Sequence, residues 1–495
     1  MLFNSEQFLV FFPIVILLFF LFPQKLRWVW LLLVSYYFYM SWNPSYAILI
    51  LISTVITYLS GIVIGQINES SYSKQQKETR KKIFVTISFI SNLAILFFFK
   101  YFDFIDNSIK HLAEQIGFEW HESKFNILLP VGISFYTFQA LGYTVDIYRG
   151  RLKPEKHFGI YALFVSFFPQ LVAGPIERAT HLLPQFKEPK KFDYERIKSG
   201  LLLMLWGLFQ KVVIADRLAV LVNSVYNNPS EYEGVQFIVA TIFFSFQIFC
   251  DFSGYSDMAI GAAKILGYDL MKNFDRPYFS KSLREFWRRW HISLSTWFRD
   301  YLYFPLGGSR VSTLKIYRNI AIVFVVSGLW HGANWTFVIW GALHGVYLII
   351  EEVSKPITDK ISRLINIDQN GFSYKFINVL KTFALVCFAW IFFRANSIND
   401  AFYIIDHLFV QNWSKLFGNN LFSLGLDEKD FYMAIISLLI LFMVHWIQRT
   451  RNIREWLDHQ WIPVRWGFYM GLVIFVLVFG YYGNYEKAEF IYFQF

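Results

Sequence analysis

Residues 318–350 read RNIAIVFVVSGLWHGANWTFVIWGALHGVYLII, a nearly uninterrupted apolar stretch. A helix needs roughly 20 mostly apolar residues to cross the hydrocarbon core of a bilayer. This stretch is longer than that, so it has room for a spanning helix followed by a second spanning or re-entrant helix. The chain is therefore expected to cross a membrane here.

The same length criterion finds further apolar stretches on both sides. Clear candidates are 7–23, 28–42, 46–65, 83–99, 235–250, 376–393, 431–449 and 466–482. Gly, Pro or charged residues interrupt three others, which are 126–148, 158–173 and 199–222. We predict an all-α, polytopic bundle of about ten to twelve membrane helices, some of them re-entrant.

The composition also indicates a membrane protein. The 495 residues are 55% hydrophobic and 21% aromatic, with a mean hydropathy of +0.38. A soluble fold would have to expose much of this apolar surface, and lipid removes that difficulty. The formal net charge of +10 comes from basic residues in short stretches between the apolar runs. That pattern is typical of the cytoplasmic loops of membrane proteins and argues against nucleic-acid binding.

No internal repeat, heptad array or low-complexity linker divides the sequence. We therefore expect one membrane domain over residues 1–495. Within it we separate N-terminal helices (1–125), a catalytic core (126–395) and C-terminal helices (396–495).

The basic residues predict an orientation. If the basic stretches up to 149–156 face the cytoplasm, the N-terminus lies outside. The next basic stretch, 187–198, follows only one apolar segment later, at 158–173. Either that segment is re-entrant or the positive-inside rule fails there.

Two carboxylates interrupt the apolar segment SFQIFCDFSGYSDMAIG (245–261). Buried charges are costly in lipid, so such residues are functional hypotheses by default. Asp251 and Asp257 would lie about 240° apart on a helix, and they share a face only if the helix breaks at Gly254. A structural role, in which each carboxylate satisfies a buried Arg, Tyr or helix end, is favoured over catalysis.

The segment SKSLREFWRRWHISLSTWFRDYLYFPLGG (280–308) combines aromatic and basic residues. Its tryptophans recur at helical spacing, which predicts one interfacial helix with an apolar stripe. Arg288 and Arg289 on the polar side suit an anionic cofactor with phosphates and an adenine ring. Contact with anionic lipid headgroups is an equally good interpretation on composition alone. The role of His291 stays open at this point.

The opening stretch places His331 in the middle of an apolar segment, next to Gly332. Imidazole titrates near neutrality and can exchange a proton with a hydroxyl nucleophile. The alternative is a histidine that only bonds a neighbouring helix. On a continuous helix His344 would lie about 220° away from His331, so we expect one of the two to be structural. The segment 161–179, broken by Pro and Gly, is expected to form a channel wall.

Other catalytic templates do not fit. The sequence has no phosphate-binding glycine loop with lysine, no HExxH and no Gly-x-Ser-x-Gly. Buried Asp and His residues are also found in the proton relays of transporters. Such proteins often carry an inverted repeat of interrupted helices, and the sequence shows none.

Six stretches together resemble the membrane-bound O-acyltransferase family, and specifically its alginate O-acetylation branch. They are FFPQLVAGPIERA (167–179), FQKVVIADRL (209–218), DFSGYSDMAIG (251–261), FWRRWHISLSTWFRDYLYFPLGG (286–308), GLWHGANWTFVIWG (328–341) and WIFFRA (390–395). Their order and spacing suit that branch, and the match extends over nearly the whole chain.

The resemblance implies a helical bundle with a central tunnel into which His331, as the catalytic residue, would project. A second position of the family's site falls on His291, and a histidine there is similar to the polysaccharide-acetylating branch. Arg288 and Arg289 are the candidates for holding the phosphates of acetyl-CoA. No permanently bound cofactor and no metal are implied.

The implied activity is acetyl transfer from cytoplasmic acetyl-CoA across the inner (plasma) membrane, for O-acetylation of an exported or cell-surface, alginate-like polysaccharide. His331 would act as general base or form a transient acetyl-histidine. The implied partners are an extracytoplasmic O-acetyltransferase, the polysaccharide acceptor and membrane lipid. The rival within the family is D-alanyl transfer to teichoic acid from a carrier-protein thioester. The length of the chain and the stretches DFSGYSDMAIG and FWRRWHISLSTW favour acetylation.

Overall fold

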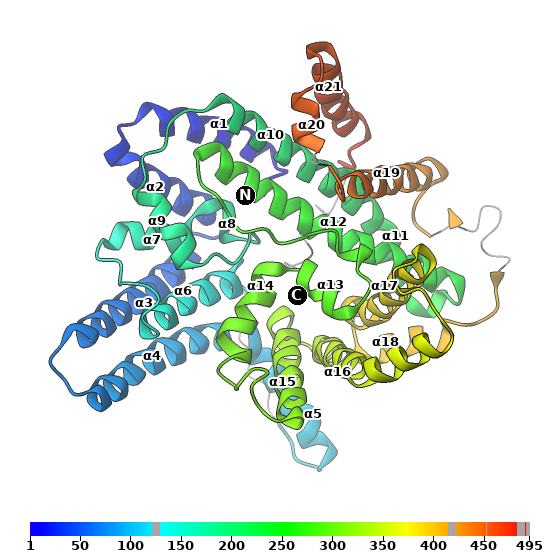
Figure 1. The fold of residues 1–495 in the computed structure, drawn as a ribbon, viewed down its shortest axis with the longest axis horizontal. Helices are drawn as coiled ribbons and strands as arrows, with labels where there is room; N and C mark the ends of the chain where they lie inside the picture. The colour runs from blue at the N-terminus through cyan, green and yellow to red at the C-terminus, as the bar shows by residue number, and fades with distance from the viewer. Residues whose placement is uncertain (121–128, 414–420, 423, 452, 483–490, 492–495) are drawn as a thin grey trace. The chain divides into compact units, whose positions relative to one another are not determined.

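The computed structural model describes residues 1–120, 129–413, 421–422, 424–451, 453–482 and 491. All regular structure in these residues is helical (Figure 1). Nine helices within the described ranges are long and apolar enough to cross a membrane, and the apolar helix α1 (Glu6–Leu21) is shorter. The protein is therefore a polytopic helical membrane protein, as the sequence predicts. The predicted boundary between 125 and 126 lies outside the described residues.

The chain folds into two compact units. The first comprises Met1–Leu201 and Ala259–Met271, and the second comprises Leu202–Met258 and Lys272–Phe495. Two helices, α10 (Tyr194–Leu208) and α12 (Val235–Leu266), carry the chain from one unit into the other. The division of a single domain into three portions stays a prediction.

The first unit has α6 (Ile133–Tyr148) at its centre, and nearly all of that helix is buried. Helices α3 (Tyr46–Glu69) and α4 (Lys74–Leu96) pack against it. At Gly61 in α3 a Cβ would lie closer than 3.0 Å to the ring of Tyr143 in α6, so the glycine permits a close approach of the two helices. The other helices of this unit are α1, α2 (Arg27–Met40), α5 (Phe102–Gln115), α7 (Phe158–Ser166), α8 (Phe168–Leu171) and α9 (Ala179–Lys187).

The segment 158–173 contains no helix long enough to cross a membrane. It forms α7 and α8, which are separated at Phe167 and are both too short to span a bilayer. Lys187, which ends α9, lies 2.6 Å from the carboxylate of Glu155, which precedes α7. The chain therefore returns to the end from which it started. This favours the alternative in which 158–173 is re-entrant. The basic stretches 149–156 and 187–198 then lie on the same side of the membrane.

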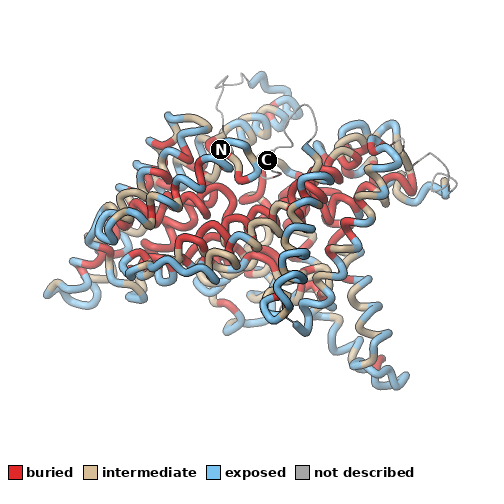
Figure 2. Tube along the Cα trace, turned by 90° about the horizontal axis from the view of Figure 1, so that it is seen from above, coloured by how far each residue is buried: buried red, intermediate tan, exposed pale blue. Residues whose placement is uncertain are grey.

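The second unit contains the longest helices of the C-terminal half (Figure 1). They are α15 (Thr313–His331), α16 (Trp335–Leu364), α17 (Phe372–Arg394), α19 (Glu428–Ile447) and α21 (Ile462–Phe479). Between them or beside them lie η3 (Phe209–Ala215), α11 (Asp216–Asn227), η5 (Pro277–Phe279), α13 (Leu283–Arg289), α14 (Ile292–Phe298), α18 (Ile398–His407) and α20 (Ile453–Asp458). Buried residues continue along the helices, and many of the connecting turns are exposed (Figure 2).

Some predicted spans differ from the helices observed. The stretch 28–42 forms a helix of only 14 residues, α2. The stretch 126–148 forms α6 from Ile133 onward, and its residues 126–128 lie outside the described ranges. The helix predicted at 235–250 continues to Leu266. Hydropathy misses this continuation because the turns directly after residue 250 carry the polar residues Asp251, Ser253 and Ser256, whose side chains are buried in protein.

Candidate active site

His331 lies at a break between two helices. It is the last residue of α15, and α16 begins at Trp335 after the N-cap residue Asn334, whose side-chain oxygen accepts a 3.0 Å hydrogen bond from the Thr336 N–H. The two helices for which 318–350 has room are therefore both present, and the break between them falls directly after His331. The asparagine cap and Gly332, which is extended at φ −156°, end one helix and start the next.

Two glycines hold this helical hairpin together. A Cβ at Gly328 in α15 would lie closer than 3.0 Å to the backbone oxygen of Phe337 in α16. A Cβ at Gly341 in α16 would lie equally close to the backbone oxygen of Phe324 in α15. The two backbones touch at these positions, so the hairpin fixes where its tip places His331.

Aromatic rings surround the His331 imidazole, which is 3% exposed. Its ring centroid lies 5.0 Å from Trp330, 5.0 Å from Trp340 and 5.5 Å from Phe393. These three rings come from α15, α16 and α17. The imidazole is thus enclosed by a rigid apolar wall on several sides, which fixes the orientation of the ring.

His291 lies beside His331, at a ring-centroid distance of 6.1 Å. It occupies the junction between α13 and α14 in the left-handed backbone region, with φ 42° and ψ 56°. Its ring is fully buried and meets the Phe252 ring of α12 edge-on at 4.6 Å. Burial lowers the pKa of the His291 imidazole to about 3, so the ring is neutral at physiological pH. The two histidines predicted as site residues are therefore brought together.

A polar cluster fixes the junction that carries His291. Asn273 accepts the Ile292 N–H on its backbone oxygen at 2.8 Å. Its side chain accepts the Ser293 hydroxyl at 2.6 Å and donates to the Ser256 hydroxyl oxygen at 3.0 Å. Ser256 belongs to the DFSGYSD motif of α12, so this motif helps to hold the Asn273 side chain in place. Sequence reasoning missed Asn273, which lies in a connection without a recognised motif.

The prediction of one continuous interfacial helix over 280–308 is wrong. The left-handed residue His291 divides the segment into α13 and α14, and Trp290 is buried in protein instead of facing lipid. Arg289 pairs with Glu285 at 2.6 Å, and Arg288 is exposed. The structure thus places Arg288 and Arg289 on a helix whose end leads directly to His291, and their role toward a cofactor stays a prediction.

His344 has a separate role. Its Nδ1 accepts a hydrogen bond from the Trp287 indole at 3.3 Å, and its ring packs on Trp340 at 5.1 Å. Trp340 also contacts His331, so one indole lies against both imidazoles. The expectation that one of the two histidines is structural fits His344. The reason given for it, their angle on a continuous helix, does not hold, because they stand on different helices.

The two aspartates of α12 bond to side chains other than those of His291 and His331. Lys211 lies 2.7 Å from Asp251 and 2.9 Å from Asp216, and all three side chains are buried. Asp257 instead accepts from the Gln210 side chain at 2.9 Å. The helix does not break between the two aspartates, which supports the structural interpretation. The predicted partner was Arg, Tyr or a helix end, and Lys211 was missed.

Gly254, between the two aspartates, serves packing. A Cβ there would lie closer than 3.0 Å to the backbone oxygen of Gly207 in α10. The glycine therefore lets α10 and α12 approach closely, and in this way brings Lys211 within reach of Asp251.

The fold and this histidine pair define the class: a multi-pass helical membrane protein with two imidazoles buried at one candidate site. The model of the membrane-bound O-acyltransferase (MBOAT) family matches residues 155–399. That range includes both histidines, the polar cluster around Asn273 and the glycine-packed hairpin.

Two curated relatives match most of the chain, and a third matches less than half of it. A probable alginate O-acetylase of Azotobacter vinelandii is 37% identical over 410 residues, 83% of this chain and 78% of the relative. A peptidoglycan O-acetyltransferase of Helicobacter pylori is 34% identical over 456 residues, 87% of this chain and 81% of the relative. A teichoic acid D-alanyltransferase of Streptococcus thermophilus is 29% identical over 241 residues, 46% of this chain and 58% of the relative.

The chain belongs to the membrane-bound O-acyltransferase family. It is therefore an O-acyltransferase, which favours the enzyme over a proton-coupled transporter. The resemblance to the alginate O-acetylation branch is confirmed by the relative from Azotobacter vinelandii.

Proposed function

We propose that the protein moves acetyl groups from acetyl-CoA toward the hydroxyl groups of an exported or cell-surface polysaccharide, with His331 as general base. The observation that carries the proposal is the pair of buried histidines, 6.1 Å apart by ring centroids, in a family of O-acyltransferases. The named activities of the two most extensively matched relatives above, acetylation of alginate and of peptidoglycan, support acetyl as the acyl group and a glycan as the final acceptor.

The proposed reaction uses the His331 imidazole twice. Its unprotonated nitrogen takes the proton of an acceptor hydroxyl, whose oxygen attacks the thioester carbonyl. When the carbon–sulfur bond breaks, the imidazolium returns the proton to the departing CoA thiolate. Neutral His291 lies close enough to orient the acceptor or the carbonyl by hydrogen bonding. The enclosing rings of Trp330, Trp340 and Phe393 limit water, which would otherwise compete as acceptor.

The same proposal extends to location and partners. The enzyme is placed in the inner (plasma) membrane, with the acetyl donor on the cytoplasmic side. A separate extracytoplasmic O-acetyltransferase would receive the acetyl group and complete the transfer to the sugar. Arg288 and Arg289 remain the candidates for binding the CoA phosphates, since they are basic residues on the helix that leads to His291.

Replacing His331 with Ala tests the proposed base. The variant is expected to lower the O-acetyl content of the exported polymer by about a hundredfold or more, because general base catalysis typically contributes that much. His459→Ala is the matched control, since it removes an exposed histidine. Normal acetylation by a His331→Ala protein that is inserted into the membrane at the wild-type level would contradict the proposed role of His331.

The D-alanyl alternative is supported by the similarity to a teichoic acid D-alanyltransferase. Purified protein supplied with radiolabelled acetyl-CoA distinguishes the two donors. We expect transfer of label to a hydroxyl acceptor, abolished in His331→Ala. If acetyl-CoA neither binds nor reacts while a D-alanyl carrier protein does, the alternative replaces our proposal.

A further inference from the structure

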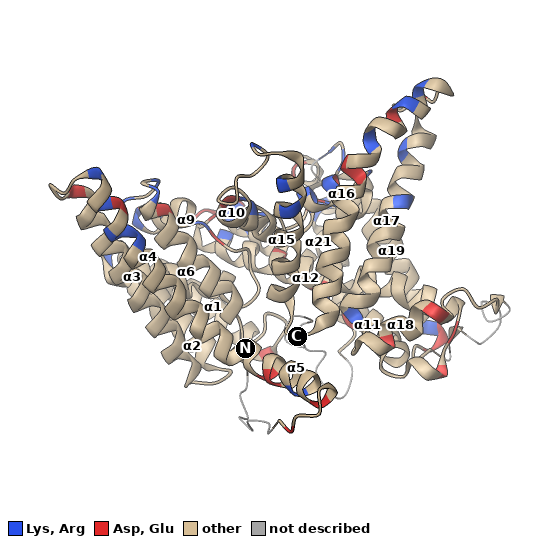
Figure 3. Cartoon of the chain, turned by 90° about the horizontal axis from the view of Figure 1, so that it is seen from below, with Lys and Arg blue, Asp and Glu red and all other residues tan. Residues whose placement is uncertain are grey.

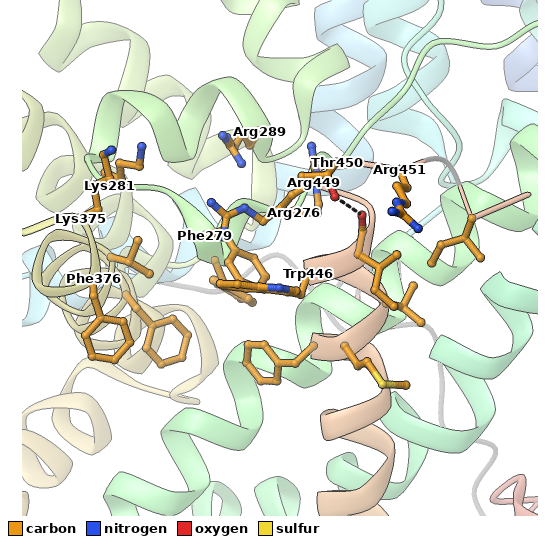
Figure 4. Close-up of a pocket in the computed structure, with 18 of the residues that line it drawn as sticks. Arg276, Phe279, Lys281, Arg289, Lys375, Phe376, Trp446, Arg449, Thr450 and Arg451 are labelled. Carbon is orange, nitrogen blue, oxygen red and sulfur yellow. Dashed lines mark hydrogen bonds between the residues drawn. The ribbon is translucent and has the colours of Figure 1, made fainter. Parts of the chain in front are cut away.

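The second unit contains a pocket of about 1280 Å³ that does not include either site histidine. It is lined by the connection before α13, Arg289 of α13, the first half of α17, the last turns of α19, the residues just after α19, two residues of α20 and one residue each of α12 and α21. Figure 4 shows basic side chains along one side of this pocket and aromatic rings along the other. The pocket is therefore amphipathic.

The basic side of the pocket has an unbalanced positive charge. Its six cationic residues are Arg276, Lys281, Arg289, Lys375, Arg449 and Arg451. None of the described residues that line the pocket is acidic. Arg276 and Arg289 are paired with neighbouring carboxylates. Within the described ranges the side chains of the other four make no ion pair, so their charge is available to an anionic ligand.

The apolar side of the pocket lies on membrane helices. Phe376 belongs to α17 and Trp446 to α19, which are both candidate membrane spans. Their side chains are 51% and 55% exposed, although they are large and apolar. Arg449 lies over the Trp446 ring at 4.6 Å, where the charged and the apolar parts of the pocket meet. Such a junction of cations and aromatic rings is typical of the membrane–water interface.

A layer of packed aromatic side chains lies between this pocket and His331. Tyr278 lines the pocket and contacts Trp290 at 6.0 Å by ring centroids. Trp290 contacts Trp390 at 5.2 Å, and Trp390 stacks on Trp340 at 5.7 Å. Trp340 and Phe393, which also contacts Trp390, then reach His331 at 5.0 and 5.5 Å. A ligand lying wholly within this pocket would have to pass this layer of rings to deliver a thioester to His331, which disfavours acetyl-CoA as the occupant. Arg289, at the edge of the pocket, is paired with Glu285 and is not one of the cations assigned to the ligand here.

We propose that this pocket is a binding site for an anionic phospholipid of the cytoplasmic leaflet. The lipid phosphate lies among the four unpaired cations, and the acyl chains lie along Phe376, Trp446 and their apolar neighbours. The positive-inside rule places the basic ends of α17 and α19 at the cytoplasmic surface, where anionic headgroups are available. The proposal is independent of the acetyl transfer argued above.

The test uses the purified full-length protein in nanodiscs of equal parts phosphatidylglycerol and phosphatidylcholine, followed by native mass spectrometry of the retained lipid. The wild type is expected to retain phosphatidylglycerol preferentially. Lys375→Gln with Arg449→Gln is expected to lower that preference at least about threefold. The matched control, Lys355→Gln with Lys360→Gln, removes the same charge from exposed lysines of α16 outside the pocket and is expected to leave the preference unchanged.

Three results would overturn the proposal. One is an unchanged preference for phosphatidylglycerol in Lys375→Gln with Arg449→Gln. Another is a loss of that preference in the α16 control that equals the loss in the pocket variant. The third is stoichiometric displacement of the lipid by free CoA, which would make the pocket a donor site. If the double variant does not fold, Arg451→Gln alone removes one exposed pocket cation and is expected to shift the preference in the same direction. Lys375→Arg with Arg449→Lys keeps both charges and should keep the preference.

Discussion

At the scale of single residues, the backbone of His291 is unusual for its residue type. Its φ of 42° lies in the left-handed region, which costs roughly 1–2 kcal/mol for a residue with a Cβ and almost nothing for glycine. Such strain persists where the surroundings hold it, and here the backbone and side chain of Asn273 do so. A histidine at a position that glycine would occupy without strain favours a role for its ring.

Comparing His291→Gly with His291→Ala separates the ring from the backbone. Both variants remove the imidazole, so we expect both to lose most acetyl transfer. The Gly variant should be about 1 kcal/mol more stable than the Ala variant, because only alanine keeps the left-handed strain. Thermal unfolding in detergent and a labelled-acetyl assay measure the two effects. Equal stability would contradict the backbone argument, and an active Gly variant would contradict the need for the ring.

Sequence reasoning found the residues of the candidate site that carry a recognisable motif and missed those that act through distant partners. His331 and His291 were selected by their motifs, and the structure brings them together. Lys211 also stands in a quoted motif, but its importance depends on Asp251, which reaches it only after α10 and α12 pack at Gly207 and Gly254. No local pattern reports such a contact.

At the scale of elements, the hairpin of α15 and α16 determines where His331 stands. Hydropathy predicted enough length for two helices in 318–350 but could not locate the turn, because the apolar character does not change across it. The break depends on the cap at Asn334 and on Gly332. The division between α13 and α14 escaped prediction for a similar reason, since the tryptophans keep helical spacing through a left-handed residue.

Gly341→Ala is expected to disturb this hairpin. The added methyl group would lie closer than 3.0 Å to the backbone oxygen of Phe324, so α15 and α16 must separate or shift. Overpacking of this kind typically costs about 1–3 kcal/mol, and it should reduce acetyl transfer as well, because the tip of the hairpin carries His331. Thermal unfolding and acetylation are measured together.

Gly471→Ala is the matched control for this change. Gly471 lies in α21, another membrane helix, and a Cβ there would meet no atom within 4 Å. We expect this variant to match the wild type in stability and activity. A Gly341→Ala protein that behaved like this control would show that the two helices do not touch at that glycine.

At the scale of the whole molecule, the basic residues gather near the ends of the long helices. Figure 3 shows Lys and Arg gathered where α3 meets α4 and toward the ends of α16 and α17, with largely uncharged helix bodies between. This distribution let the sequence predict a multi-pass helical protein and most of its spans. It could not decide whether 158–173 crosses the membrane, because the apolar character of a segment does not reveal that its helices are short and broken at Phe167.

The resulting topology predicts which loops share a side. Residues 149–156 and 187–198 flank a segment that does not cross, so Lys153→Cys and Lys191→Cys should both react with a membrane-impermeant maleimide only after cells are permeabilised. The helical stretch Tyr194–Asn227 has 34 residues and does span the bilayer by length, so Glu231→Cys should react in intact cells. The native Cys250 and Cys387 are buried and should give little background. Labelling of Lys191→Cys in intact cells would mean that α7 to α9 carry the chain across the membrane after all, and would reverse the assigned sides of every later loop.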